Sequence, residues 1–228
     1  MIKRRAFGSR LLHDKSGLAL LEFAFMLPIL LTMILTGAEL TNYITTKMRI
    51  SQLALHLADD AARMGVNTSG SDLAEKISES DINDIFTGAQ MQSGEMNLNA
   101  NGRVILSSLE PVASPNTTNK YTIRWQRCFG QKTSHASGYG TAGQTNLNGI
   151  GPTGRLVTAQ DDNATMFVEV YYQYQPLIGL GTLAPTSTFT ETASMAVRDR
   201  RDFSDDSATT NQHPNGIWKV AGVTASTC

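Results

Sequence analysis

The sequence predicts an α+β protein in which a long N-terminal helix packs on a C-terminal antiparallel β-sheet. Two observations predict the helix: a continuous apolar run over residues 18–38, and a helical apolar periodicity that continues over residues 39–65. A third observation predicts the sheet. Runs rich in β-branched and aromatic residues follow one another beyond residue 95 with no helical pattern between them.

The apolar run is long enough to cross a membrane. It contains a single ionisable residue, Glu22, and at about 1.5 Å per residue it spans the roughly 30 Å hydrocarbon core of a bilayer. The charged residues before it are Lys3, Arg4, Arg5, Arg10 and Lys15, opposed by Asp14. This positive bias places residues 1–17 in the cytoplasm and sends the chain after the run to the other side of the membrane.

The N-terminal segment has three interpretations. It is a cleaved signal peptide, an uncleaved anchor, or a leader that is cut after Gly17 and leaves the apolar helix on the mature protein. The apolar run is long for a signal peptide, and Thr36-Gly37-Ala38 is a poor small-residue cleavage site. Glu22 favours the third interpretation, because an ionisable side chain costs at least about 2.5 kcal/mol at the bilayer centre and so needs a partner.

Two explanations of the Glu22 carboxylate remain open at this point. Cleavage after Gly17 would give Leu18 a new ammonium group, about 6 Å from Glu22 along the same helix face. That amine could then pair with the carboxylate of its own chain or of a staggered neighbouring helix. Alternatively, Glu22 reaches the cytoplasmic headgroups by snorkelling, which needs no cleavage.

The segment from Lys15 to Pro28, KSGLALLEFAFMLP, resembles the processing region of type IV-type prepilins. More narrowly, it resembles the TadE-like pseudopilins, the minor pilins of the tight-adherence (Flp) pilus system. Members of that family carry a basic leader, a glycine at the cut, a glutamate at the fifth mature position, Phe-Ala, and an apolar run interrupted by proline. Gly17, Glu22 and Pro28 occupy those positions here, and we expect Pro28 to kink the helix.

The resemblance implies a structural minor pilin with a pilin-like fold, and not an enzyme. It implies cleavage between Gly17 and Leu18 by a prepilin peptidase, and pairing of Glu22 with the N-terminal amine of a neighbouring pilin or pseudopilin. It also implies a single pass through the inner membrane, a cytoplasmic N-terminus, a periplasmic C-terminal domain and a role in assembling an extracellular adhesion pilus. The alternative is a signal-anchored periplasmic enzyme or ligand-binding protein.

We expect residues 66–228 to form one exported α+β head. A helical pattern that Ser71 or Asp72 can cap is expected to break near Ser80 or Asp81, where a second short helix starts. The four expected strands lie within residues 97–112, 121–129, 165–175 and 189–197. They are expected to form an antiparallel meander with the long helix covering one face, and Trp218 and Val220 could dock a last short strand.

The two cysteines, Cys128 and Cys228, both lie on the exported side of the membrane. In an oxidising compartment we expect them to form a disulfide that ties the polar tail to the second strand. The alternative is that Cys228 is an unpaired thiol at the end of the tail.

A loop rich in glycine, threonine and asparagine is predicted over residues 130–155. A connection of this length is either a contact surface or a tolerated insertion, and the sequence leaves both open.

Signals of chemistry elsewhere in the chain are weak. Two G-x-G-x-x-G matches lie inside the Gly-rich loop rather than between a strand and a helix, and the four histidines are scattered. Asp161-Asp162-Asn163 lacks the fuller pattern of a calcium loop. The formal net charge is −1, and no basic face interleaved with aromatic residues appears in the exported part. We therefore expect no cofactor, no metal site and no nucleic-acid partner.

Overall fold

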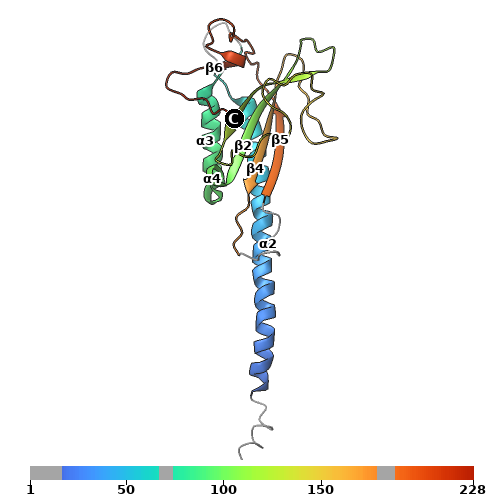
Figure 1. The fold of residues 1–228 in the computed structure, drawn as a ribbon, viewed down its shortest axis with the longest axis vertical. Helices are drawn as coiled ribbons and strands as arrows, with labels where there is room; N and C mark the ends of the chain where they lie inside the picture. The colour runs from blue at the N-terminus through green and yellow to red at the C-terminus, as the bar shows by residue number, and fades with distance from the viewer. Residues whose placement is uncertain (1–16, 67–73, 179–187) are drawn as a thin grey trace, which may run out of the picture. The chain divides into compact units, whose positions relative to one another are not determined.

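The computed structural model describes residues 17–66, 74–178 and 188–228. The chain divides into two compact units. One comprises Met1–Ile44 with Pro176–Pro185, and the other comprises Thr45–Gln175 with Thr186–Cys228. The α+β class is confirmed: a long N-terminal helix is followed by a four-stranded antiparallel sheet (Figure 1).

One helix, α2 (Leu18–Arg63), contains both the apolar run and the amphipathic segment. In the first unit it also supplies a buried carboxylate, that of Glu39, which accepts a hydrogen bond from the backbone N–H of Ile178 at 3.0 Å. In the second unit its buried side chains recur at helical spacing. They are Ile50, Leu53, Ala54, Leu57, Ala58, Ala61 and Ala62. Burial on one face is what the periodicity of residues 39–65 predicts.

The C-terminal end of α2 is held by a segment from the far end of the chain. The buried guanidinium of Arg201 donates from Nη2 to the carbonyl oxygens of Ala61 at 3.1 Å and Met64 at 2.8 Å. These bonds satisfy carbonyls that have no partner within the helix. Gly65 follows with φ of +136°, a conformation that favours glycine and that ends the helix near the expected residue.

The four-stranded sheet has the order β3-β2-β4-β5, and every neighbouring pair is antiparallel. Its strands are β2 (Gly102–Pro111), β3 (Tyr121–Phe129), β4 (Thr165–Gln173) and β5 (Thr188–Ala196). The expected meander is wrong, because β4 pairs with β2 and not with β3, its predecessor in sequence. The long connection between β3 and β4 lets the chain pass to the other side of β2.

The predicted helix near residues 71–79 is also wrong over its described part. After an isolated bridge between Val66 and Lys76, the chain forms β1 (Ile77–Ser78), and α3 (Glu79–Ser93) begins only then. This segment is a strand because it pairs with the C-terminal tail: β1 pairs in parallel with β6 (Ile217–Trp218). This pairing confirms a last short strand at Trp218. Two short helical segments follow α3, namely η1 (Gly94–Met96) and α4 (Leu98–Asn101), and α4 lies where the start of a strand was expected. Another short helix, η3 (Pro214–Gly216), precedes β6.

Helices and a long loop cover opposite faces of the sheet. On the helix side, Arg127 of β3 pairs with the buried Glu79 at the start of α3, donating from Nε at 2.9 Å. On the loop side, a buried cluster joins strand residues to the connection between β3 and β4. Its members are Leu109, Tyr121, Ile123, Ile150, Ala159 and Phe167, with Tyr139, Leu147 and Val157 packed against it. Residues 130–155 are therefore built into the fold rather than added to it.

Two buried polar side chains hold this connection to the sheet. Glu169 of β4, which is 1% exposed, accepts hydrogen bonds from the Ser137 hydroxyl and from the Gly138 N–H at 3.0 Å. Gln126 of β3 donates to the Gly140 carbonyl at 2.9 Å and accepts from the Ala142 N–H at 3.1 Å. Buried polar groups of this kind are stable only when paired, so they specify where the loop lies.

Candidate functional site

The predicted processing residues lie at the start of the described helix. α2 begins at Leu18, and the Gly17 carbonyl accepts a hydrogen bond from the Leu21 N–H at 3.1 Å. Glu22 lies one turn after Leu18 on the same helix face, and both side chains are exposed. The leader itself, residues 1–16, lies outside the described residues.

The surface around Glu22 is apolar and uncovered. Within the described residues, α2 is long and apolar enough to cross a membrane, with a mean hydropathy of 2.4 over its best window and none of that window buried. The core helix of a soluble protein would bury such a window. Pro28 lies inside α2, and the helix continues through it, so the predicted kink stays a prediction.

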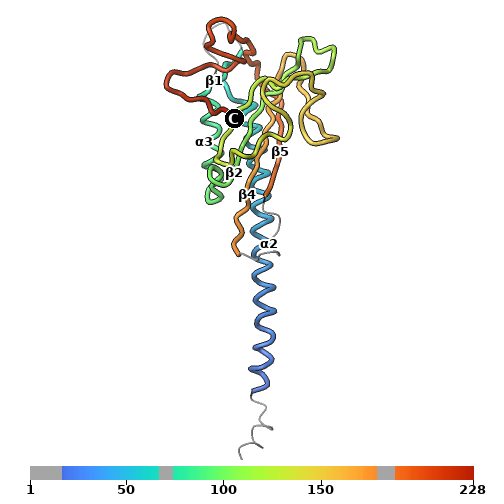
Figure 2. The backbone as a smooth tube through the Cα atoms, viewed as in Figure 1, coloured from blue at the N-terminus to red at the C-terminus, as the bar shows by residue number. Residues whose placement is uncertain are grey.

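The cysteines lie together in the second unit. Cys128 of β3 and Cys228 form a disulfide with an S–S distance of 2.10 Å, and they are 100 residues apart in sequence. The tail is also held by hydrogen bonds, from the Cys128 N–H to the Ser226 carbonyl at 2.7 Å and from the Asn83 side chain to the Thr224 carbonyl at 3.0 Å. Figure 2 shows the C-terminus, marked C, at the sheet, where Cys228 is bonded to β3.

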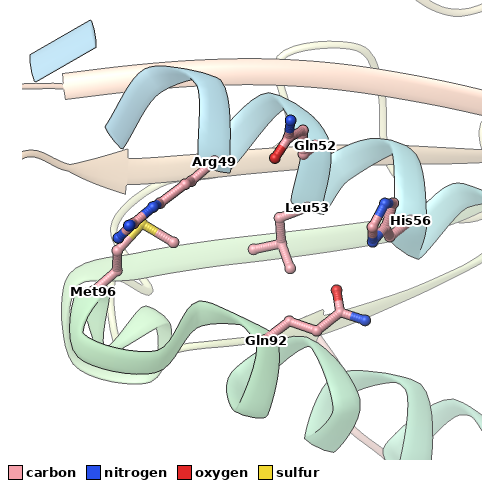
Figure 3. A pocket seen from close by; sticks show the side chains of 6 residues that line it. All are labelled: Arg49, Gln52, Leu53, His56, Gln92 and Met96. Atoms are coloured by element: carbon pink, nitrogen blue, oxygen red, sulfur yellow. The ribbon is translucent and has the colours of Figure 1, made fainter. Parts of the chain in front are cut away.

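A groove between α2 and α3 is a second candidate site. Its volume is about 330 Å³, and its lining consists of Arg49, Gln52, Leu53, His56, Gln92 and Met96. Figure 3 shows Leu53 and Gln92 pointing toward one another between the two helices, with Arg49 extending toward Met96. The lining holds neither a carboxylate nor a nucleophile, so it offers no acid–base pair and no metal ligand set.

Two carboxyl groups in the sheet have raised pKa values, but they do not form an acid–base pair. Burial raises the pKa of Glu110 to about 7, against the opposing charge of Arg124 and a hydrogen bond from Ser108. Burial also raises the pKa of Glu169, although its bonds to Ser137 and Gly138 oppose the shift. Among the described residues, no group of three or more His, Cys, Asp or Glu side chains is placed to hold a metal ion.

The sequence did not predict several of these buried, paired charges. Glu169 gave one signal, a carboxylate in the middle of an otherwise apolar and aromatic strand, which predicts a buried acid with a specific partner. Arg201 and Glu79 gave none, because their partners are distant in sequence.

Comparison of the chain with protein-family models, with curated proteins and with solved structures gives no match. The fold and the site therefore define its class: an α+β protein with one described helix that is long and apolar enough to span a membrane.

Proposed function

We propose that the chain is a structural minor pilin of the TadE-like type, processed after Gly17 and acting in assembly of a tight-adherence pilus. Its mature helix would lie in the inner membrane with the C-terminal unit in the periplasm, before or without incorporation into a filament. Its partners would be a prepilin peptidase and other pilins and pseudopilins. It would have no catalytic activity.

One observation carries this proposal: an acidic residue stands four positions after Leu18 inside an exposed apolar helix that begins at Leu18. A lone carboxylate in hydrocarbon costs at least about 2.5 kcal/mol, and an opposite charge on the adjacent turn offsets that cost. Cleavage after Gly17 creates such a charge at Leu18. The KSGLALLEFAFMLP resemblance supports the same cleavage site.

The mature N-terminus tests the proposal. The full chain is expressed in bacterial membranes with and without a prepilin peptidase, and its N-terminal peptide is determined by mass spectrometry. We expect a chain beginning at Leu18 only when the peptidase is present. A chain beginning after Ala38 would favour a cleaved signal peptide, and one that retains Met1 under both conditions would favour a plain anchor. Either result overturns the proposal.

The role of Glu22 is tested separately from cleavage. With Glu22→Ala, we expect normal processing but at least about tenfold less cross-linking to neighbouring pilins, because the amine loses its partner. Glu22→Asp keeps the charge and should restore part of the cross-linking. Thr32→Ala is the matched control, since the Thr32 hydroxyl donates to the Ile29 carbonyl of its own helix. Equal cross-linking by Glu22→Ala and the parent removes the assigned role.

A further inference from the structure

The two outer strands of the sheet differ in how their free edges are covered. The edge of β3 is covered at both ends. Tyr121 exchanges backbone hydrogen bonds with Leu147 at 2.9 and 3.0 Å, and the Ile123 N–H donates to the Gln144 carbonyl at 2.9 Å. At the other end, the Cys128 N–H donates to the tail.

The edge of β5 carries no such cover in the described part of the chain. The strand pairs with β4 over its whole length without a bulge, and no described backbone group bonds to the outer edge of residues 190–195. Alternate residues of an antiparallel strand present their N–H and C=O groups to that edge. Edge strands are commonly protected by lysine, proline or a bulge, whereas β5 has none of these and only one charge, Glu191.

A groove of about 430 Å³ runs along this edge. Five consecutive β5 residues, Thr190, Glu191, Thr192, Ala193 and Ser194, line it together with Leu55 of α2 and, from the loop side, Tyr139, Pro152, Arg155, Val157 and Phe167. The backbone of β5 therefore lies between two walls, which are Leu55 on the α2 side and the loop-side residues on the other.

The two walls belong to opposite faces of the sheet. Phe167 pairs with Ser194 in register and lies in the loop-side cluster. The neighbouring residue Met166 points to the other face, where Arg201 links it to the end of α2. A strand added to β5 would lie between these two groups of residues.

We propose that this edge binds an extended segment of a partner polypeptide, which adds to β5 as a further strand and alternates apolar with acidic residues. Strand addition supplies affinity through main-chain hydrogen bonds and specificity through alternate side chains. Leu55, 52% exposed, receives the apolar side chains. Arg155 is exposed and has no ion pair among the described residues, so it attracts acidic side chains on the loop side. Glu191, on the α2 side, repels acids from the apolar wall. The inference does not depend on cleavage of the leader.

The probe is the peptide acetyl-Val-Asp-Val-Asp-Val-Asp-Val-amide, titrated into the full chain in detergent micelles. Binding is measured by fluorescence anisotropy, and backbone protection by hydrogen exchange. We expect saturable binding and slower exchange of β5 amides within residues 190–195. Two N-methylated peptides, one modified at every valine and one at every aspartate, test whether the peptide binds as an added strand. Only one set of residues can face β5, so one modification abolishes binding and the other leaves it intact.

A charge reversal tests the acidic preference. Arg155→Glu should weaken binding of this peptide about three- to tenfold and improve binding of the counterpart with lysine in place of aspartate. Arg49→Glu is the matched control, because it makes the same charge change at an exposed position in the other groove, and it should alter neither affinity.

Three results would overturn the proposal. The first is no binding of the aspartate peptide. The second is binding that both N-methylated peptides retain, which would indicate a charge contact without strand addition. The third is β5 protection that appears without peptide and rises with protein concentration together with a dimer in sedimentation, which would assign the edge to a second copy of this chain.

Discussion

Glu110 and Glu169 show how one physical cause, burial, gives carboxyl groups of the same sheet two different roles. The buried Glu169 holds the loop through Ser137 and Gly138, whose hydrogen bonds offset part of the cost of burying its charge. Glu110 has the Ser108 hydroxyl and the nearby charge of Arg124, and its pKa is raised to about 7. Glu110 therefore makes stability depend on pH near neutrality.

The sign of that dependence follows from the shift. The folded pKa of Glu110 lies above the ordinary value of 4.5, so the folded state binds more protons than the unfolded state between pH 4.5 and 7. Its contribution to stability is therefore most favourable below pH 4.5 and declines as pH rises through 7. Glu110→Gln should raise the free energy of unfolding at pH 8, by about 1 to 3 kcal/mol, and change it little at pH 4.5.

Urea unfolding of the full chain in detergent at both pH values measures this difference. Glu95→Gln is the control, because that residue is exposed in η1 and should leave the pH dependence unchanged. A Glu110→Gln effect of equal size at both pH values contradicts the assignment.

At the scale of an element, the start of α3 was misplaced because two local signals compete. Ser80 and Asp81 both look like helix caps in sequence, yet Ser78 is the cap. Its hydroxyl accepts from the Asp81 N–H at 3.3 Å, while the Asp81 carboxylate accepts from the Ser78 N–H at 2.8 Å. This reciprocal capping box moves the helix start toward the N-terminus, and pairing of β1 with β6 stops it there.

Ser78→Ala should therefore lower the free energy of unfolding by about 1 kcal/mol. Ser80→Ala is the matched control and should be nearly neutral, because Ser80 already lies inside the first turn. Thermal unfolding followed by circular dichroism compares the two variants. A larger loss from Ser80→Ala would mean that the helix starts where the sequence analysis placed it.

At the scale of the whole molecule, the disulfide closes a large covalent loop. It joins Cys228 to β3 across 100 residues, and so encloses β4, β5 and the tail. Within this loop the chain passes from β3 to the far side of β2, where β4 pairs with β2 and β5 pairs with β4. Closing it restricts the unfolded chain far more than the folded one.

Reduction of the disulfide should lower the free energy of unfolding by about 4 kcal/mol on the chain-entropy model. Denaturant unfolding of the oxidised full chain, with and without reductant, gives the value. The double variant Cys128→Ala/Cys228→Ala should have the free energy of unfolding of the reduced protein, and adding reductant should not change it. A reduced chain as stable as the oxidised one would show that the tail's hydrogen bonds alone hold it.

The sequence by itself determined the elements whose periodicity is local. The apolar and amphipathic segments of α2 and the positions of β3, β4 and β5 follow from side-chain patterns that repeat within a few residues. The expected site residues Gly17, Leu18 and Glu22 were likewise available from sequence, because their spacing along one helix is a local property.

Only the tertiary structure decided which strands are neighbours, where α3 begins and what covers each face of the sheet. These features depend on partners far apart in the chain, such as Glu169 with Ser137 and Arg201 with the end of α2. A buried charge or an unpaired carbonyl imposes its cost only once the chain is compact, and no short stretch of sequence records which distant group will satisfy it.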